Sequence, residues 1–128
     1  MNHQQELHCC DAGTKNKKNK SISLKYDINL QKGTKILLSN KLAIDVQSHM
    51  LGALSSHYKV NDGGVRHAPF WVLVGASRPS ILVEVGYITH PTERIRLFNE
   101  QYQDKVAQGI ADGVTQYLIN RTKEIEDL

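Results

Sequence analysis

One acidic side chain stands inside the most apolar segment of the chain. Glu84 lies within Ile81-Leu82-Val83-Glu84-Val85-Gly86-Tyr87-Ile88, whose other members are apolar, aromatic or small. An ionised carboxylate that is buried without a partner is strongly unfavourable, so this residue needs a compensating group. Two interpretations remain open: an ion pair with Arg66 or Arg78, or a functional carboxylate that acts as a general base or lies beside a metal ion.

The histidines and cysteines form no metal motif that spacing alone identifies. No pair of histidines follows the H-E-x-x-H or H-x-x-x-H pattern, and the two cysteines are adjacent, which is not the spacing of a zinc C-x-x-C. His8 nevertheless stands directly before Cys9 and Cys10, so this segment has the ligand chemistry for a soft metal. Loop, capping or solvent-edge positions are the simpler interpretation for His49, His57, His67 and His90.

Alternating and continuous apolar runs predict the strands that position these groups. Residues 21–30 place apolar side chains on one parity, which predicts a half-buried strand near a sheet edge, and Gly33 then breaks the pattern. Residues 70–74 and 81–88 are short apolar runs, typical of strands buried on both faces. Glu84 would lie near the carboxyl end of the second run, where open α/β sheets place their sites.

Helical spacing predicts three helices. The first begins at about Asn40, is capped by Ser39 or Asn40, and ends around residues 57–58, before a polar turn at residues 61–64.

The second helix covers roughly residues 92–98, with Pro91 in its first turn and a cap at His90 or Thr89. Asn99 caps a third, long amphipathic helix, and the tail from Thr122 is expected to fray. This element order predicts an α/β fold with a mostly parallel or mixed central sheet flanked by helices.

Length and charge limit the possible classes of protein. The 128 residues correspond to one domain, divided here into a Lys/Asn-rich loop or frayed terminus (1–20), the main part (21–121) and a charged tail (122–128). The net charge of +3 is concentrated early, because residues 1–41 hold eight lysines against three acidic residues. No arginine or aromatic residue accompanies the lysine run at 15–20, so nucleic-acid binding is a minor hypothesis. No apolar run suggests a membrane span or a signal peptide.

Three segments together resemble the C-terminal part of the zinc-dependent N-acetylmuramoyl-L-alanine amidases of bacterial cell walls, the amidase_3 family. Ser39-Asn40-Lys41-Leu42-Ala43 opens a helix, and Asp62-Gly63-Gly64-Val65-Arg66 precedes Phe70-Trp71-Val72-Leu73. The segment from Pro79 to Pro91 is similar to the family signature P-x-x-L-V-E-x-G-[FY]-[IL]-[ST]-N-P. His90 replaces the usual asparagine of that signature.

The resemblance implies an activity and a cofactor. Family members hydrolyse the amide between the lactyl group of N-acetylmuramic acid and L-alanine of the stem peptide. One zinc ion, held by two histidines and one glutamate, polarises the carbonyl and activates a water, and the signature glutamate, here Glu84, serves as general base and then acid. Leu7-His8-Cys9-Cys10-Asp11 loosely resembles a strand end that supplies one histidine ligand, which makes His8 the candidate zinc ligand.

Two further family motifs have no counterpart here, namely D-x-G-H-G and the later carboxylate ligand. We therefore expect an N-terminally incomplete fragment of the catalytic domain that is inactive alone and self-associates through an exposed sheet edge. The alternative is a non-catalytic peptidoglycan-binding or regulatory module. The resemblance implies a location in the periplasm or cell envelope, although this chain shows no signal peptide.

Overall fold

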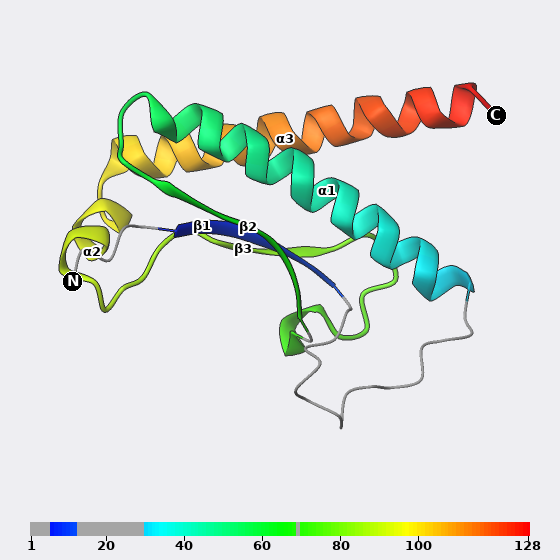
Figure 1. The fold of residues 1–128 in the computed structure, drawn as a ribbon, viewed down its shortest axis with the longest axis horizontal. Coiled ribbons are helices and arrows are strands. Elements are labelled where there is room, and N and C mark those ends of the chain that lie inside the picture. The colour runs from blue at the N-terminus through cyan, green and yellow to red at the C-terminus, as the bar shows by residue number, and fades with distance from the viewer. Residues whose placement is uncertain (1–5, 13–29, 69) are drawn as a thin grey trace.

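The computed structural model describes residues 6–12, 30–68 and 70–128. The elements follow in the order β1 (Glu6–Ala12), α1 (Leu30–Ser55), β2 (Asn61–Ala68), the 3-10 helix η2 (Trp71–Leu73), β3 (Ile81–Glu84), α2 (Pro91–Leu97) and α3 (Glu100–Glu126). The strands form one layer, and the two long helices α1 and α3 cross each other on the same side of it (Figure 1).

The sheet is mixed, as predicted. Its strand order is β2-β1-β3, with β1 parallel to β2 and antiparallel to β3. The register of β1 with β2 shifts by one residue, because Leu7 pairs with Asp62 and His8 with Gly64. Gly64 has a φ of 74°, in the left-handed region that favours glycine, and its N–H donates to Oδ1 of Asp62 at 2.8 Å. This β-bulge is the observed form of the polar segment 61–64, which is part of a strand and not a free turn.

The hydrophobic core lies between α1, α3 and one face of the sheet. Helix α1 buries residues spaced three or four apart, as expected for the inner stripe of an amphipathic helix. The sheet contributes alternate residues of β3, Ile81 and Val83, which are half-buried against this core. The buried apolar members are Ala43, Val46, Met50, Leu54, Tyr102 and Val106.

Two glycines let the long helices approach each other closely. A Cβ added at Gly113 would lie 2.4 Å from the Cα of Val46, and one added at Gly109 would lie 2.6 Å from the Cα of Met50. Both distances fall well inside van der Waals contact with backbone atoms, so only glycine fits at these two positions without a shift of the helices.

Helix α1 is longer than the sequence pattern indicated. It begins at Leu30, so the predicted start at Asn40 is wrong, and Gly33 lies inside the helix with open space around its Cα. Ser39 is not a cap: it is fully buried, and its hydroxyl accepts a hydrogen bond from the N–H of Ser80 at 3.0 Å. A single glycine in a helix interior costs only about 1 kcal/mol relative to alanine, so α1 can continue through it. Of the strand predicted at residues 21–30, only Leu30 lies within the described residues, where it is helical.

The apolar run at residues 70–74 does not form a buried strand. It contains η2 instead, and its Trp71 is 87% exposed. The position beside β1 is taken by β2, whose Val65 packs against the core although its neighbours are polar. Strand β3 is also shorter than the predicted run, since it ends at Glu84. It is half-buried, because helices cover only one of its faces.

The two C-terminal helices confirm the predicted caps. His90 accepts from the N–H of Glu93 at 3.3 Å at the start of α2, and Asn99 accepts from the N–H of Tyr102 at 3.0 Å at the start of α3. Helix α3 continues to Glu126, so the expected fraying from Thr122 is wrong. None of the helices in the described part of the chain is long and apolar enough to span a membrane.

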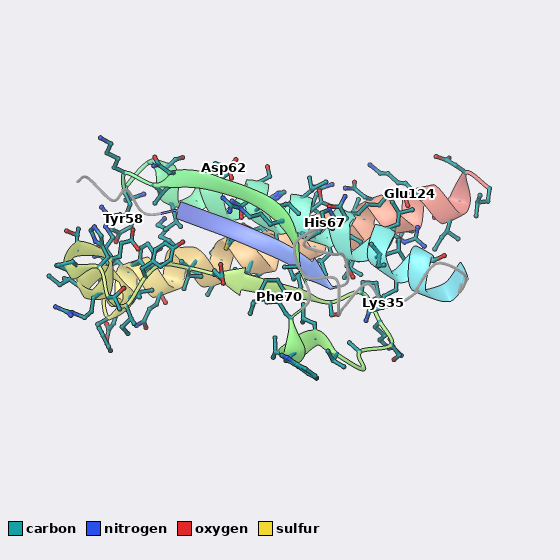
Figure 2. All side chains as sticks on the ribbon, turned by 60° about the horizontal axis from the view of Figure 1, so that its bottom comes forward. Lys35, Tyr58, Asp62, His67, Phe70 and Glu124 are labelled. Carbon is teal, nitrogen blue, oxygen red and sulfur yellow. The ribbon has the colours of Figure 1, made fainter. Side chains whose placement is uncertain are left out.

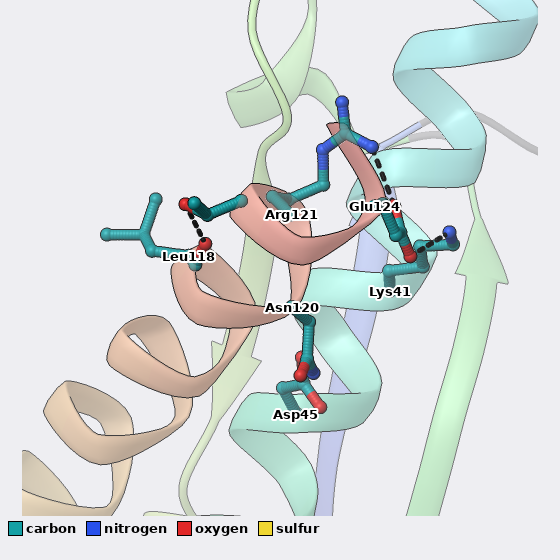
Figure 3. Close-up of polar contacts among 7 residues, drawn as sticks. Lys41, Asp45, Leu118, Asn120, Arg121 and Glu124 are labelled. Carbon is teal, nitrogen blue, oxygen red and sulfur yellow. Dashed lines mark hydrogen bonds and ion pairs between the residues drawn. The ribbon is translucent and has the colours of Figure 1, made fainter. Parts of the chain in front are cut away.

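Polar contacts between α1 and α3 explain why the last turns remain helical (Figure 3). Lys41 and Arg121 donate to opposite oxygens of Glu124 at 2.6 and 2.7 Å, and Asn120 donates to Asp45 at 3.1 Å.

Candidate active site

The two residues that the sequence singled out for chemistry occupy paired positions on neighbouring strands. Glu84 is the last residue of β3, and its Cα partner in the antiparallel pairing with β1 is His8. On its other side, His8 is paired with Gly64 of β2. Directly paired positions of adjacent strands lie on the same face of a sheet, so His8 and Glu84 share a face.

That face is the one that the long helices leave uncovered. Side chains alternate along a strand, and Ile81 and Val83 pack against the core under α1. Leu82 and Glu84 therefore belong to the opposite face, where both are half-buried. Figure 2 turns this side of the sheet forward, with the helices behind it. Glu84 is thus half-buried on the face that α1 and α3 do not cover.

Two buried side chains hold the backbone that follows Glu84. The hydroxyl of Tyr102 donates to the carbonyl oxygen of Val85 at 2.7 Å, and the N–H of Tyr87 donates to Oε2 of Glu93 at 2.7 Å. Tyr102 and Glu93 are each only 1% exposed. Sequence reasoning missed both residues. The signal available for Glu93 was its place three residues after a helix N-cap, where glutamate commonly bonds a backbone N–H.

A second pair of side chains fixes β2 beside His8. Oδ1 of Asp62 accepts from the amide nitrogen of Gln47 at 2.7 Å as well as from the N–H of Gly64. Gln47 is 4% exposed on the inner side of α1. The bulge opposite His8 is therefore anchored to the central helix of the core.

Three other histidines in the described part of the chain make local contacts. His49 pairs through Nδ1 with the carbonyl oxygen of Asp45 at 2.8 Å, and Nδ1 of His57 lies 2.7 Å from the hydroxyl of Ser56. His90 is the α2 cap. His67 lies on β2 and not in a loop, as Figure 2 shows.

A metal site can be assessed from the donor types at the paired positions. Imidazole and carboxylate, the groups of His8 and Glu84, are both zinc ligands. Among residues 33–68 and 70–128, no group of three or more His, Cys, Asp or Glu side chains is placed to hold a metal ion. The residues present at the pair fit part of a zinc site, and further ligands would have to join His8.

A hollow of about 340 Å³ lies at the far end of α3, away from Glu84. Lys41, Tyr117 and Glu124 are among the residues that line it. Hydrogen bonds from Lys41 and then Arg121 hold the pKa of Glu124 below its usual value, and burial raises the pKa of Tyr117. These contacts join α1 to α3.

Comparison with known proteins relates this chain to one family. The Amidase_3 model, described as N-acetylmuramoyl-L-alanine amidase, matches residues 7–116. Protein YqiI of Bacillus subtilis is 35% identical over 79 residues, which are 62% of this chain and 36% of YqiI. The N-acetylmuramoyl-L-alanine amidase AmiA of Escherichia coli is 35% identical over 77 residues, which are 60% of this chain and 27% of AmiA.

A solved structure gives the same assignment. The N-acetylmuramoyl-L-alanine amidase AmiC2 of Nostoc punctiforme superposes with a TM-score of 0.60 and 26% identity, over 92% of this chain and 52% of that chain. The chain thus spans about half of this structure and less of the two relatives above. Because the family model covers most of the sequence and the fold agrees, the chain belongs to the Amidase_3 family of N-acetylmuramoyl-L-alanine amidases.

Proposed function

We propose that this chain is part of a peptidoglycan hydrolase that cleaves the amide between N-acetylmuramic acid and L-alanine of the stem peptide. The observation that supports this most directly is the pairing of His8 with Glu84 on the uncovered face of the sheet. Membership of an amidase family supports the same reaction.

Glu84 is proposed to act as the general base and then as the general acid. Its carboxylate takes a proton from the attacking water and returns a proton to the nitrogen of the leaving L-alanine as the amide bond breaks. Proton transfer by a positioned carboxylate typically contributes about 10²–10⁴-fold to a rate. Its place at the end of β3, on a half-buried face, allows a water and a substrate to reach it.

His8 is proposed to hold a zinc ion. When bound, zinc polarises the amide carbonyl and makes a bound water more acidic. A catalytic zinc normally has three protein ligands, so His8 needs two further ligands besides the proton-transferring Glu84. For this reason zinc content is the first property to measure.

The proposed setting follows from the reaction. Peptidoglycan lies in the cell envelope, so we propose that the chain acts there, with residues 21–121 and the strand β1, which carries His8, as the amidase part. Both β2 and β3 are edge strands of the three-stranded sheet described here. An open edge offers unpaired backbone groups to a further strand, which supports self-association as a second property.

A non-catalytic module is the second candidate. It would bind peptidoglycan or regulate an enzyme without cleaving the amide. The observation that favours it lies in the sequence, where the D-x-G-H-G motif of the family has no counterpart.

Zinc content and stem-peptide release distinguish the two. Two quantities are measured on each purified protein: zinc per chain and the release of stem peptide from purified peptidoglycan. The proteins are the parent, His8→Ala and Glu84→Gln, and the variant of the exposed His57, His57→Ala, is the matched control. Zinc that is lost only in His8→Ala, with release lost in Glu84→Gln, supports the amidase. Co-sedimentation with peptidoglycan without zinc or release supports the module and overturns catalysis by this chain.

A further inference from the structure

We propose that Tyr102 and Glu93 are positioning residues that orient Glu84 through the backbone of residues 85–87. The inference rests on the proposed role of Glu84 as the proton-transferring carboxylate. Neither residue lies on the uncovered face, because both are buried beneath the segment that follows β3.

The segment 85–87 is apolar, yet β3 ends at Glu84. Beyond that point two backbone groups bond to side chains: the carbonyl of Val85 accepts from Tyr102, and the N–H of Tyr87 donates to Glu93. Gly86, between them, has a φ of 150°, in the range that favours glycine. The chain therefore turns away from the sheet immediately after Glu84, and the turn is held on both sides of Gly86.

Tyr102 is itself rigidly placed. It lies in the first turn of α3, where its N–H bonds to the cap Asn99. Its ring packs edge-on against Tyr58, with 5.2 Å between the ring centroids. Because the ring cannot move without disturbing these contacts, its hydroxyl is a fixed donor to the carbonyl of Val85.

The burial of Glu93 is the stronger evidence for a specific role. It is 1% exposed, one carboxylate oxygen accepts the N–H of Tyr87, and the other oxygen has no hydrogen-bond partner within the described part of the chain. Burying a carboxyl group with one unsatisfied oxygen is costly, and such groups in native proteins require an explanation. Fixing the loop beside Glu84 supplies one.

Helices α2 and α3 are thus linked to Glu84 through the backbone: Tyr102 of α3 bonds before Gly86, and Glu93 of α2 bonds after it. A shift of this turn would alter the backbone of Glu84 while its pairing with β1 stays in place. Small displacements of a reacting group strongly reduce rates, so a fixed turn matters for a residue that must meet a water and a leaving nitrogen.

The test observes Glu84 directly and needs no catalytic activity. The side-chain carboxyl ¹³C signal of Glu84 is assigned by its loss in Glu84→Gln, and is then recorded in Tyr102→Phe and Glu93→Ala. We expect it to move and broaden in both variants. Glu93→Gln keeps an oxygen acceptor for the N–H of Tyr87, so it should restore the parent signal.

A control separates positioning from loss of stability. Val46→Ala destabilises the fully buried core of α1 without removing either hydrogen bond. The proposal is overturned if the Glu84 signal is unchanged in Tyr102→Phe and Glu93→Ala, or if Val46→Ala moves it as much. A responsive signal without stem-peptide release supports the positioning while refuting catalysis. Release of stem peptide together with an unchanged Glu84 signal supports catalysis while refuting the positioning.

Discussion

The Cα of Gly113 in α3 faces the Cα of Val46 in α1 so closely that a methyl group added to the glycine would lie 2.4 Å from the Val46 Cα. The long helices therefore touch backbone to backbone at this point. Their crossing buries Val46 and Met50, and it sets where the first turn of α3, with Tyr102, lies over the end of β3.

Gly113→Ala should lower the free energy of unfolding. The new methyl group meets backbone that cannot rotate away, and overpacking of this kind typically costs about 1–3 kcal/mol or more. The matched control is Gly52→Ala in α1, where nothing lies within 4 Å of an added Cβ. That variant should gain up to about 1 kcal/mol, because alanine favours the helix over glycine. Denaturant unfolding measures both, and equal effects would contradict the close helix contact.

Ser39→Ala should also destabilise the fold. The serine hydroxyl is fully buried and accepts the N–H of Ser80 just before β3, so its removal leaves a donor without a partner. A buried donor left in this state costs about 1–3 kcal/mol. Ser48→Ala, at an exposed position of the same helix, is the control and should be neutral or slightly stabilising. If the two variants unfold alike, the contact between α1 and the start of β3 is absent in solution.

The Glu124 ion-pair cluster predicts a pH dependence of stability. Because the pKa of Glu124 is lowered in the folded state, its stabilising effect is present above the ordinary value of 4.5 and is lost as the pH falls through the lowered pKa. Glu124→Gln should therefore melt below the parent at neutral pH, and this difference should shrink in acid. Added salt should also reduce this difference in melting temperature, since the side chains of Lys41 and Glu124 are both 39% exposed.

The exposed Glu126→Gln serves as the control for this cluster. Thermal melts from neutral pH to below pH 4.5 measure both variants. A melting difference between the parent and Glu124→Gln that is independent of pH would contradict the ion-pair explanation.

Trp71 is the only tryptophan, which makes its exposure measurable. At 87% exposure, its fluorescence in the folded protein should peak near that of tryptophan in water and be quenched readily by acrylamide. A strand buried on both faces would instead give a blue-shifted, protected signal. Dilution is the control, because protection that appears only at high protein concentration reports self-association and not burial within one chain.

Local features of the chain predicted several elements correctly. His90 followed by Pro91, and Asn99 before an amphipathic run, predicted two helix starts that the structure confirms. Capping depends on residues within one turn of each other, so sequence contains the necessary information. Glu84 near the end of a short strand was also predictable, since a charged residue in an apolar run is evident from the sequence itself.

Features that depend on distant partners were not predictable. The run at residues 70–74 has the composition of a buried strand, but β2 occupies the place beside β1. Gly33 resembles a helix breaker, yet the helix continues through it. Residues 122–126 resemble a frayed tail, but contacts from Lys41 keep them helical. The strand order and the Lys41 contact each depend on residues far apart in the sequence.

The candidate site divides in the same way. Residue types alone indicated Glu84 and His8, because carboxylate and imidazole chemistry depends on the side chain itself. Only strand pairing brought the two positions together on one face of the sheet. Only helix packing placed Tyr102 and Glu93 against the segment that follows Glu84. The chemistry of a side chain depends on that residue alone, whereas its position depends on residues elsewhere in the chain that the fold brings beside it.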